Sequence, residues 1–104
     1  MPLEGDGGEQ LVTTGGLLTA FVAAAGSLNV IARPGRLCRI VITTVGTATA
    51  TIYDNASGAA SGNVLFVVPA NATLGEPFDI QLRCAKGIYV AGQAGSPGFA
   101  LGYC

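Results

Sequence analysis

Residues 78–84 read FDIQLRC, and this stretch decides the expected fold. Its apolar residues, at positions 78, 80, 82 and 84, alternate with Asp79, Gln81 and Arg83. A two-residue period places one set on a buried face and the other in water, as in a strand of an antiparallel sheet. Residues 47–54, TATATIYD, show the same period and carry no helical stripe. Both stretches therefore predict β-strands.

Six further segments are predicted to be strands because runs of apolar or β-branched residues end at Gly, Pro, Asn or Ser. They are residues 17–25, 28–32, 37–44, 64–68, 88–91 and 99–103. The first of them contains an alanine run that is also compatible with a helical turn. Seven or eight short strands predict an all-β fold, a single antiparallel β-sandwich or jelly-roll-like domain.

The chain of 104 residues has room for one domain. Residues 1–10 hold three of the six acids and are predicted to form a flexible, acidic, Gly-rich N-terminal arm, with the sandwich domain at 11–104. The longest apolar stretch, residues 17–25, is far shorter than the roughly 20 residues of a membrane span. No basic leader precedes it. We therefore expect no membrane partner.

The composition excludes several kinds of chemistry. The chain has no His, so it has no imidazole base and no His-ligated metal. Its net charge of −1 offers no basic surface for a nucleic acid backbone. Outside the arm its acids, Asp54, Glu76 and Asp79, are scattered and suggest no paired-carboxylate site. We expect no enzyme activity, no catalytic residue, no cofactor, no metal and no nucleic acid partner.

Half of the residues are apolar, so some apolar surface must face outward, and such surface usually marks a partner. Residues 64–68, VLFVV, have no polar side chain on either face. One face of this strand is expected in the core. The other is covered either by residues 17–25 or by a neighbouring subunit. The interface candidates are Leu65 and Val67, together with Leu17 and Phe21.

Three of the five cations, Arg33, Arg36 and Arg39, fall within seven residues. Two interpretations stay open: an ordinary solvated turn, or a carboxylate site that receives an acidic tail from a neighbour. In the second case the arginines are further interface candidates and act as an electrostatic latch.

The three cysteines, Cys38, Cys84 and Cys104, are odd in number and lack C-x-x-C spacing, which argues against a zinc site. We expect buried free thiols at Cys38 and Cys84, with a bridge between them as the alternative if their strands are adjacent. Cys104 is the candidate for an intermolecular contact.

Three blocks carry a family resemblance: PGRLCRIVITTVGTATATIYDNASG from Pro34, VLFVVPA from Val64, and FDIQLRCAKGIYVAGQAGSPGFALGY from Phe78. They resemble small all-β structural proteins of tailed bacteriophage particles, of the head-decoration (cement) or head-fibre type. Within them, Pro34-Gly35-Arg36-Leu37, Ile52-Tyr53-Asp54 and Val68-Pro69-Ala70 match the turns and core positions of that pattern. The resemblance covers about two-thirds of the chain.

The resemblance implies a non-enzymatic virion protein. It would be a capsid decoration protein that binds the outer surface of the major capsid protein and stabilises subunit junctions. It would act as a homo-oligomer, preferably a trimer, on particles assembled in the bacterial host cytoplasm. One alternative is a virion protein of the tail, neck or fibre base. Another is a secreted carbohydrate-binding or adhesin module.

Overall fold

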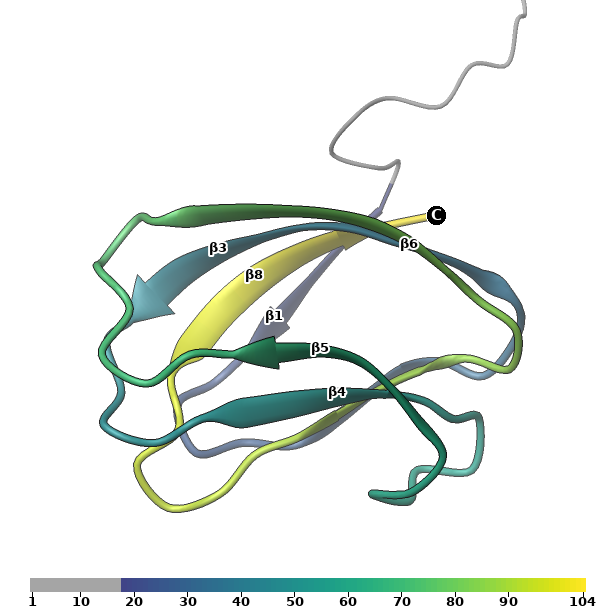
Figure 1. Cartoon of the computed structure of the whole chain (residues 1–104), viewed down its shortest axis with the longest axis horizontal. Coiled ribbons are helices and arrows are strands. Elements are labelled where there is room, and N and C mark those ends of the chain that lie inside the picture. Colours follow the sequence, from purple (N-terminus) through teal and green to yellow (C-terminus); the bar gives the residue numbers. More distant parts are fainter. Residues whose placement is uncertain (1–17) are drawn as a thin grey trace, which may run out of the picture.

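The computed structural model describes residues 18–104, which form eight strands in two antiparallel sheets (Figure 1). The first sheet has the order β1-β8-β3-β6 and the second has the order β2-β7-β4-β5. The predicted all-β sandwich is confirmed. The strands are β1 (Leu18–Val22), β2 (Leu28–Ile31), β3 (Gly35–Thr44), β4 (Ala50–Asp54), β5 (Asn63–Val68), β6 (Pro77–Cys84), β7 (Ile88–Ala91) and β8 (Gly98–Tyr103).

The pairing follows one rule along the chain. β1 pairs with β8, β2 with β7, β3 with β6 and β4 with β5, each time antiparallel. The two halves of the chain thus run beside each other like one long hairpin. This hairpin is rolled up by the additional pairs β3–β8 and β4–β7. The result is an eight-stranded jelly roll.

The core lies between the two sheets and is built from alternate residues of the strands. Phe99 and Leu101 of β8 occupy the middle of the first sheet and are fully buried. Burial of side chains of this size contributes about 1.5–3 kcal/mol each. The other large, fully buried aliphatic side chains are Leu37, Ile40, Ile42, Ile52, Val68, Ile88 and Val90.

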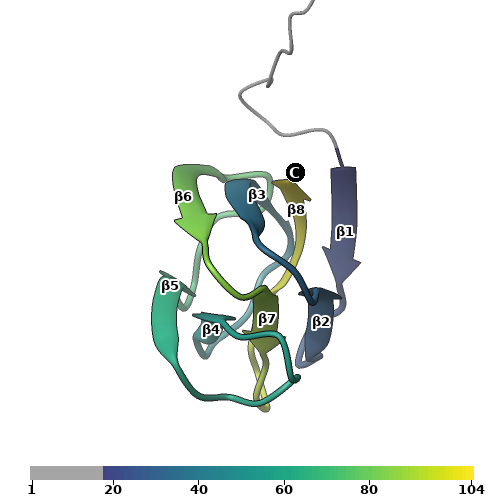
Figure 2. The same cartoon turned by 90° about the vertical axis from the view of Figure 1, so that its right-hand side faces the viewer.

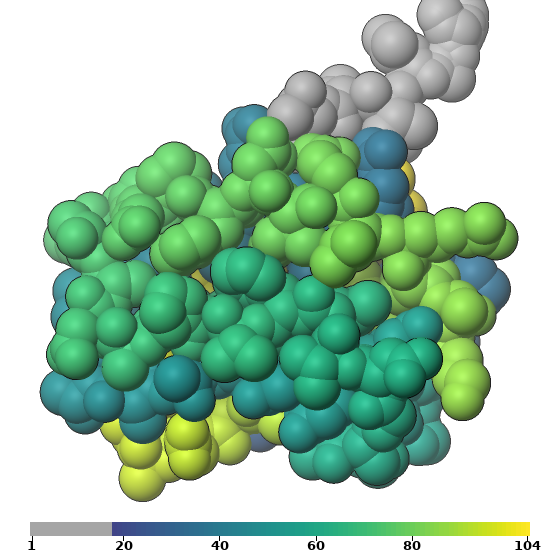
Figure 3. Space-filling model, viewed as in Figure 1, coloured from purple at the N-terminus to yellow at the C-terminus, as the bar shows by residue number. Residues whose placement is uncertain are grey.

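Strands β5 and β6, one from each sheet, close one long side of the sandwich, and Figure 3 shows their side chains meeting there. The rings of Phe66 and Phe78 pack against each other across this side in a tilted arrangement, with centroids 5.6 Å apart. β1 and β2 lie on the opposite side (Figure 2). Of the two alternatives for the second face of β5, cover by residues 17–25 is therefore wrong, because β1 lies at the far edge of the other sheet.

Most strand bounds agree with the expected ones within one residue, and three differ by more. β1 ends at Val22 rather than at residue 25. β4 begins at Ala50 rather than at Thr47, because the amides of Thr47 and Ala48 both donate to the carbonyl of Gly95. β3 begins at Gly35, inside the predicted turn, since Arg36 exchanges two backbone hydrogen bonds with Cys104. The predicted arm at residues 1–10 and the candidate Leu17 lie outside the described residues.

Candidate functional site

The outer face of the second sheet, over the residues that the structure describes, carries no charged side chain. In β4, Ala50, Ile52 and Asp54 are buried, so Thr51 and Tyr53 point outward. In β7, Tyr89 and Ala91 point outward for the same reason. The edge strand β5 adds Val64 and Val67, which are 52% and 45% exposed. Asn29 of β2 completes the face.

The register of the strands arranges these residues in two rows. Tyr53 lies opposite both Tyr89 and Val64, so one row runs Asn29, Tyr89, Tyr53, Val64. Thr51 lies opposite both Ala91 and Val67, which gives the second row. Directly opposed side chains in antiparallel strands lie within contact distance. Tyr-rich, uncharged patches are typical of the centre of protein interfaces. We call these seven residues the tyrosine face.

The predicted contact at Val67 lies on this face, but Leu65 does not share it. The pairing of β4 with β5 shifts between Ile52 and Tyr53, which leaves Leu65 as the extra residue of a bulge. Its side chain is half-buried and packs against the core. Leu65 therefore lies outside the tyrosine face, and its role as a contact residue stays a prediction. Because its side chain packs against the core, Leu65→Asp would perturb folding as well as any docking contact.

Phe21 lies on the outer face of the other sheet. It is 74% exposed and stands opposite Ala100, which in turn lies opposite Val41. The structure does not bring Phe21 and Val67 together, because β1 and β5 belong to different sheets. Phe21 can serve a contact of its own on the β1 side, and it cannot share one flat interface with Val67.

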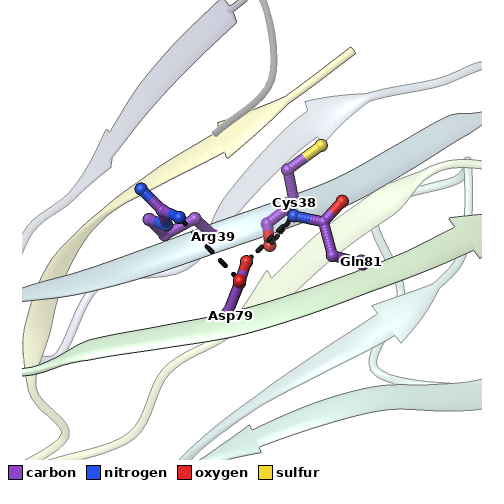
Figure 4. A network of polar contacts seen from close by, with 4 residues as sticks. All are labelled: Cys38, Arg39, Asp79 and Gln81. Carbon is purple, nitrogen blue, oxygen red and sulfur yellow. Dashed lines mark hydrogen bonds and ion pairs between the residues drawn. The ribbon is translucent and has the colours of Figure 1, made fainter. Parts of the chain in front are cut away.

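The three arginines of the predicted latch have different surroundings. Arg39 Nη2 lies 3.8 Å from Asp79 Oδ2, and Gln81 Nε2 donates to the other oxygen of that carboxylate at 2.9 Å (Figure 4). Arg33 is exposed and donates to the adjacent carbonyl of Pro34. Arg36 lies directly opposite Arg83 of β6. The Arg39–Asp79 pair is exposed, so it contributes at most about 1 kcal/mol.

Charge is distributed unevenly over the two ends of the sandwich. The end where β3 begins and β6 ends carries four cations: Arg33, Arg36, Arg83 and Lys86. The loops at the other end, residues 23–27, 45–49, 69–76 and 92–97, carry Glu76 as their one charged residue. The cationic end was visible in the sequence only in part, since Arg83 and Lys86 reach it through the pairing of β6 with β3.

Asp54 is the one buried acid among the described residues, and it joins the two sheets. It ends β4 in the second sheet and accepts three amide hydrogen bonds from the turn between β6 and β7. The amides of Ala85, Lys86 and Gly87 donate to it at 3.0, 2.8 and 3.2 Å. Burial alone would raise the pKa of Asp54, but the three amides outweigh burial and hold the pKa below its ordinary value.

This lowered pKa predicts an acid-labile fold. The folded state keeps Asp54 ionised at pH values where the unfolded chain, with a pKa of about 3.9, already binds a proton. The stabilisation is therefore complete above about pH 4 and is lost as the pH falls through the folded pKa. Urea unfolding between pH 2 and 6 measures it. The difference in free energy of unfolding between the wild-type chain and Asp54→Asn should become smaller as the pH falls, because Asp54 is then protonated. The other carboxyl groups titrate in both chains, so their effect cancels in this comparison.

All three cysteines are free, as expected for Cys38 and Cys84. Cys84 belongs to the core cluster between the sheets, and Cys38 is buried outside that cluster. Burial raises the pKa of both thiols, so both are neutral at pH 7. Cys104 is partly exposed.

Residues 18–104 contain no cluster of three His, Cys, Asp or Glu side chains that could hold a metal ion. The same part of the chain has no helix long and apolar enough to cross a membrane.

The sequence alone did not reveal Tyr89 and Val64 as surface residues. The alternation in TATATIYD did separate Tyr53 from the buried face. The rows that join these residues depend on the register of β4 with β5 and β7, which no single strand encodes. Comparison with family models, with curated proteins and with solved structures found no match.

Proposed function

We propose that this chain is a non-enzymatic structural protein of a virus particle that docks on a larger protein shell through the tyrosine face. The observation that carries the proposal is the uncharged character of that face, which exposes Val64 and Val67 beside Tyr53 and Tyr89. An interface core of this composition buries apolar area with little desolvation cost.

Two further features support a capsid decoration role. The sequence blocks resemble phage head-decoration proteins, in which such a domain binds the major capsid protein. Jelly rolls are common in viral coats, although they also occur in lectins, so the fold by itself assigns no function. A site in the tail, neck or fibre base uses the same contact with fewer copies per particle.

The first experiment is sedimentation of a native lysate of the source, followed by immunoblotting for the chain. A decoration protein runs with fast particles that contain a shell protein, at a copy number close to that of the shell. A tail or neck protein runs with the same particles at a few copies each. Recovery of the chain only in the slow fraction contradicts the proposal.

Val67→Asp should weaken binding to such particles at least tenfold. The variant places a charge at the exposed end of the second row, where it would be buried on docking. A tenfold weaker binding corresponds to a loss of about 1.4 kcal/mol in binding free energy. The matched control is Val45→Asp, because Val45 is similarly exposed, at 52%, but lies in a loop at the opposite end from the four cations. Pelleting of purified variants with particles that lack the chain measures the bound fraction.

Circular dichroism checks that both Val67→Asp and Val45→Asp are folded. Equal binding by the two variants would exclude the tyrosine face as the contact.

The carbohydrate-binding alternative would use the same face differently, because adjacent tyrosines can stack on a sugar ring. Binding in a glycan screen that is lost in Tyr89→Ala, without binding to particles, would favour the carbohydrate-binding alternative.

A further inference from the structure

Two of the three cysteines lie near each other in the first sheet, where the end of β8 meets the beginning of β3. Arg36 of β3 and Cys104 exchange two backbone hydrogen bonds, at 3.0 and 3.1 Å, so the two residues are directly opposed. Cys38 follows two residues later on β3, and its Sγ lies 3.8 Å from the carbonyl oxygen of Arg36. Cys38 and Cys104 are therefore close neighbours on adjacent strands.

A β-bulge brings Cys38 closer to Cys104 than a regular ladder would. In a regular ladder Cys38 would lie opposite Gly102, two residues from Cys104. Instead Gly102 pairs with Arg39, and Cys38 is the extra residue of the bulge. Adjacent strands lie about 4.8 Å apart, so an offset of less than two residues brings the Cα atoms close to the range of about 4.4–6.8 Å that a disulfide requires.

The side chain of Cys38 also lies on the same side of the sheet as this neighbour. Cys38 is fully buried, yet it does not belong to the core cluster between the sheets. Figure 4 shows its sulfur pointing away from the second sheet. Cys84, by contrast, is a member of the core cluster. Cys104 rather than Cys84 is therefore the thiol that Cys38 can reach.

The surroundings of Cys38 affect its ionisation in two directions. Burial raises the pKa of its thiol most, and Cys104 raises this pKa further, while the Arg36 guanidinium lowers it. Nε of Arg36 is buried and has no hydrogen-bond acceptor among residues 18–104, so a thiolate would supply the acceptor that it lacks. A thiolate beside a guanidinium group is the species that attacks a disulfide.

Cys104 is accessible to a reagent, whereas Cys38 is not. Cys104 is partly exposed and lines a surface pocket of about 420 Å³ together with Arg36 and Arg83. Cys38 is fully buried. A reagent therefore reaches Cys104 first, and the two arginines favour an anionic reagent such as glutathione disulfide.

We propose that Cys104 and Cys38 are a redox-active pair that closes into a disulfide, with glutathione disulfide as the oxidant. The thiolate of Cys104 attacks one glutathione sulfur, which forms a mixed disulfide and releases one glutathione thiolate. The thiolate of Cys38 then attacks Sγ of Cys104 and releases the second glutathione thiolate. Two protein thiols are oxidised, the oxidant is reduced to two molecules of glutathione, and the protons of the protein thiols pass to the released thiolates.

The bridge would join β3 to the end of β8 and would close strands β4 to β8 into one covalent loop. Reducing surroundings keep such a pair open, and oxidising surroundings close it. The pair lies in the first sheet and the tyrosine face in the second, so this proposal does not depend on the proposed function.

The test exposes the folded, fully reduced chain to glutathione disulfide at pH 8 and follows its mass. The wild-type chain should lose two hydrogen atoms without retaining glutathione, and trypsin should release peptide 37–39 linked to the peptide that begins at Gly87. Cys38→Ala should accumulate about tenfold more glutathione on Cys104 than the wild-type chain, because no second thiol displaces it. Cys84→Ala is the matched control, since it removes a core thiol and should still form the bridge.

Equal accumulation of glutathione on Cys104 in the wild-type chain and in Cys38→Ala would overturn the proposal. A disulfide-linked dimer on a non-reducing gel, in place of the internal bridge, would also overturn it, because Cys104 would then react with a second copy. Loss of the bridge in Cys84→Ala would show that Cys84 is the partner instead. An unreactive Cys104 would contradict the access that the pocket provides.

Discussion

Asp54→Ala is expected to lower the free energy of unfolding by about 3 kcal/mol. The carboxylate accepts hydrogen bonds from three consecutive amides, those of Ala85, Lys86 and Gly87. The variant removes the acceptor and leaves these amides without it. The turn they form joins β6 of the first sheet to β7 of the second, so the loss affects the connection between the sheets.

Chemical denaturation at pH 7 measures this effect. Asp54→Asn separates charge from shape, because its amide oxygen can still accept bonds from Lys86 and Gly87 while its NH₂ group faces the amide of Ala85. It should lose less stability than Asp54→Ala. Asp79→Asn is the control, since Asp79 is an exposed acid in a pair at 3.8 Å and should change stability by less than about 1 kcal/mol. Equal stability of all three variants would contradict the role assigned to Asp54.

Gly92→Ala is expected to destabilise the fold by about 3 kcal/mol. Gly92 follows β7, and a Cβ atom placed there would overlap the carbonyl oxygen of Gly26 in the loop between β1 and β2. Its neighbour at 2.7 Å, the carbonyl carbon of Gly26, is also backbone, so no side chain can move aside. The amide of Gly92 also donates to Ser27 Oγ at 3.0 Å, which keeps the two loops together.

Thermal unfolding of Gly92→Ala beside Gly75→Ala isolates this collision. Gly75 has a φ of 80°, and a Cβ atom at this position would meet no other atom within 4 Å. Its replacement therefore costs only the left-handed backbone strain, about 1–2 kcal/mol. A larger loss of stability in Gly92→Ala is the expected order. The reverse order would show that the two loops separate easily.

Local pattern was sufficient to predict the strands but not their pairing. The alternation in residues 78–84 placed Phe78 and Ile80 toward the core, where the structure finds them. It also placed Leu82 there, yet Leu82 is 43% exposed because β6 is an edge strand. Which strand lies at an edge depends on contacts between distant residues, and a single sequence does not display them.

The β-bulges could not be predicted from the sequence either. The irregularity at Leu65 moves that side chain toward the core, and Gln81 adopts a φ of 55° near the shift between β3 and β6. Neither residue is a glycine, which would have signalled a left-handed or bulged position. The hydrogen bonds of Asp54 to a turn more than 30 residues away were equally hidden, since the sequence shows only an acid at a strand end.

The placement of β8 between β1 and β3 has a consequence for the order of folding. Among residues 18–104, β1 has no other neighbour in its sheet, so it has no strand of this part of the chain to pair with until residues 98–103 have been synthesised. During translation its apolar side chains, including Phe21, remain without a strand partner while some eighty residues are added. Closure of the first sheet therefore waits for β8 and has a long loop to close. We expect slow folding, with which intermolecular strand pairing competes at high protein concentration.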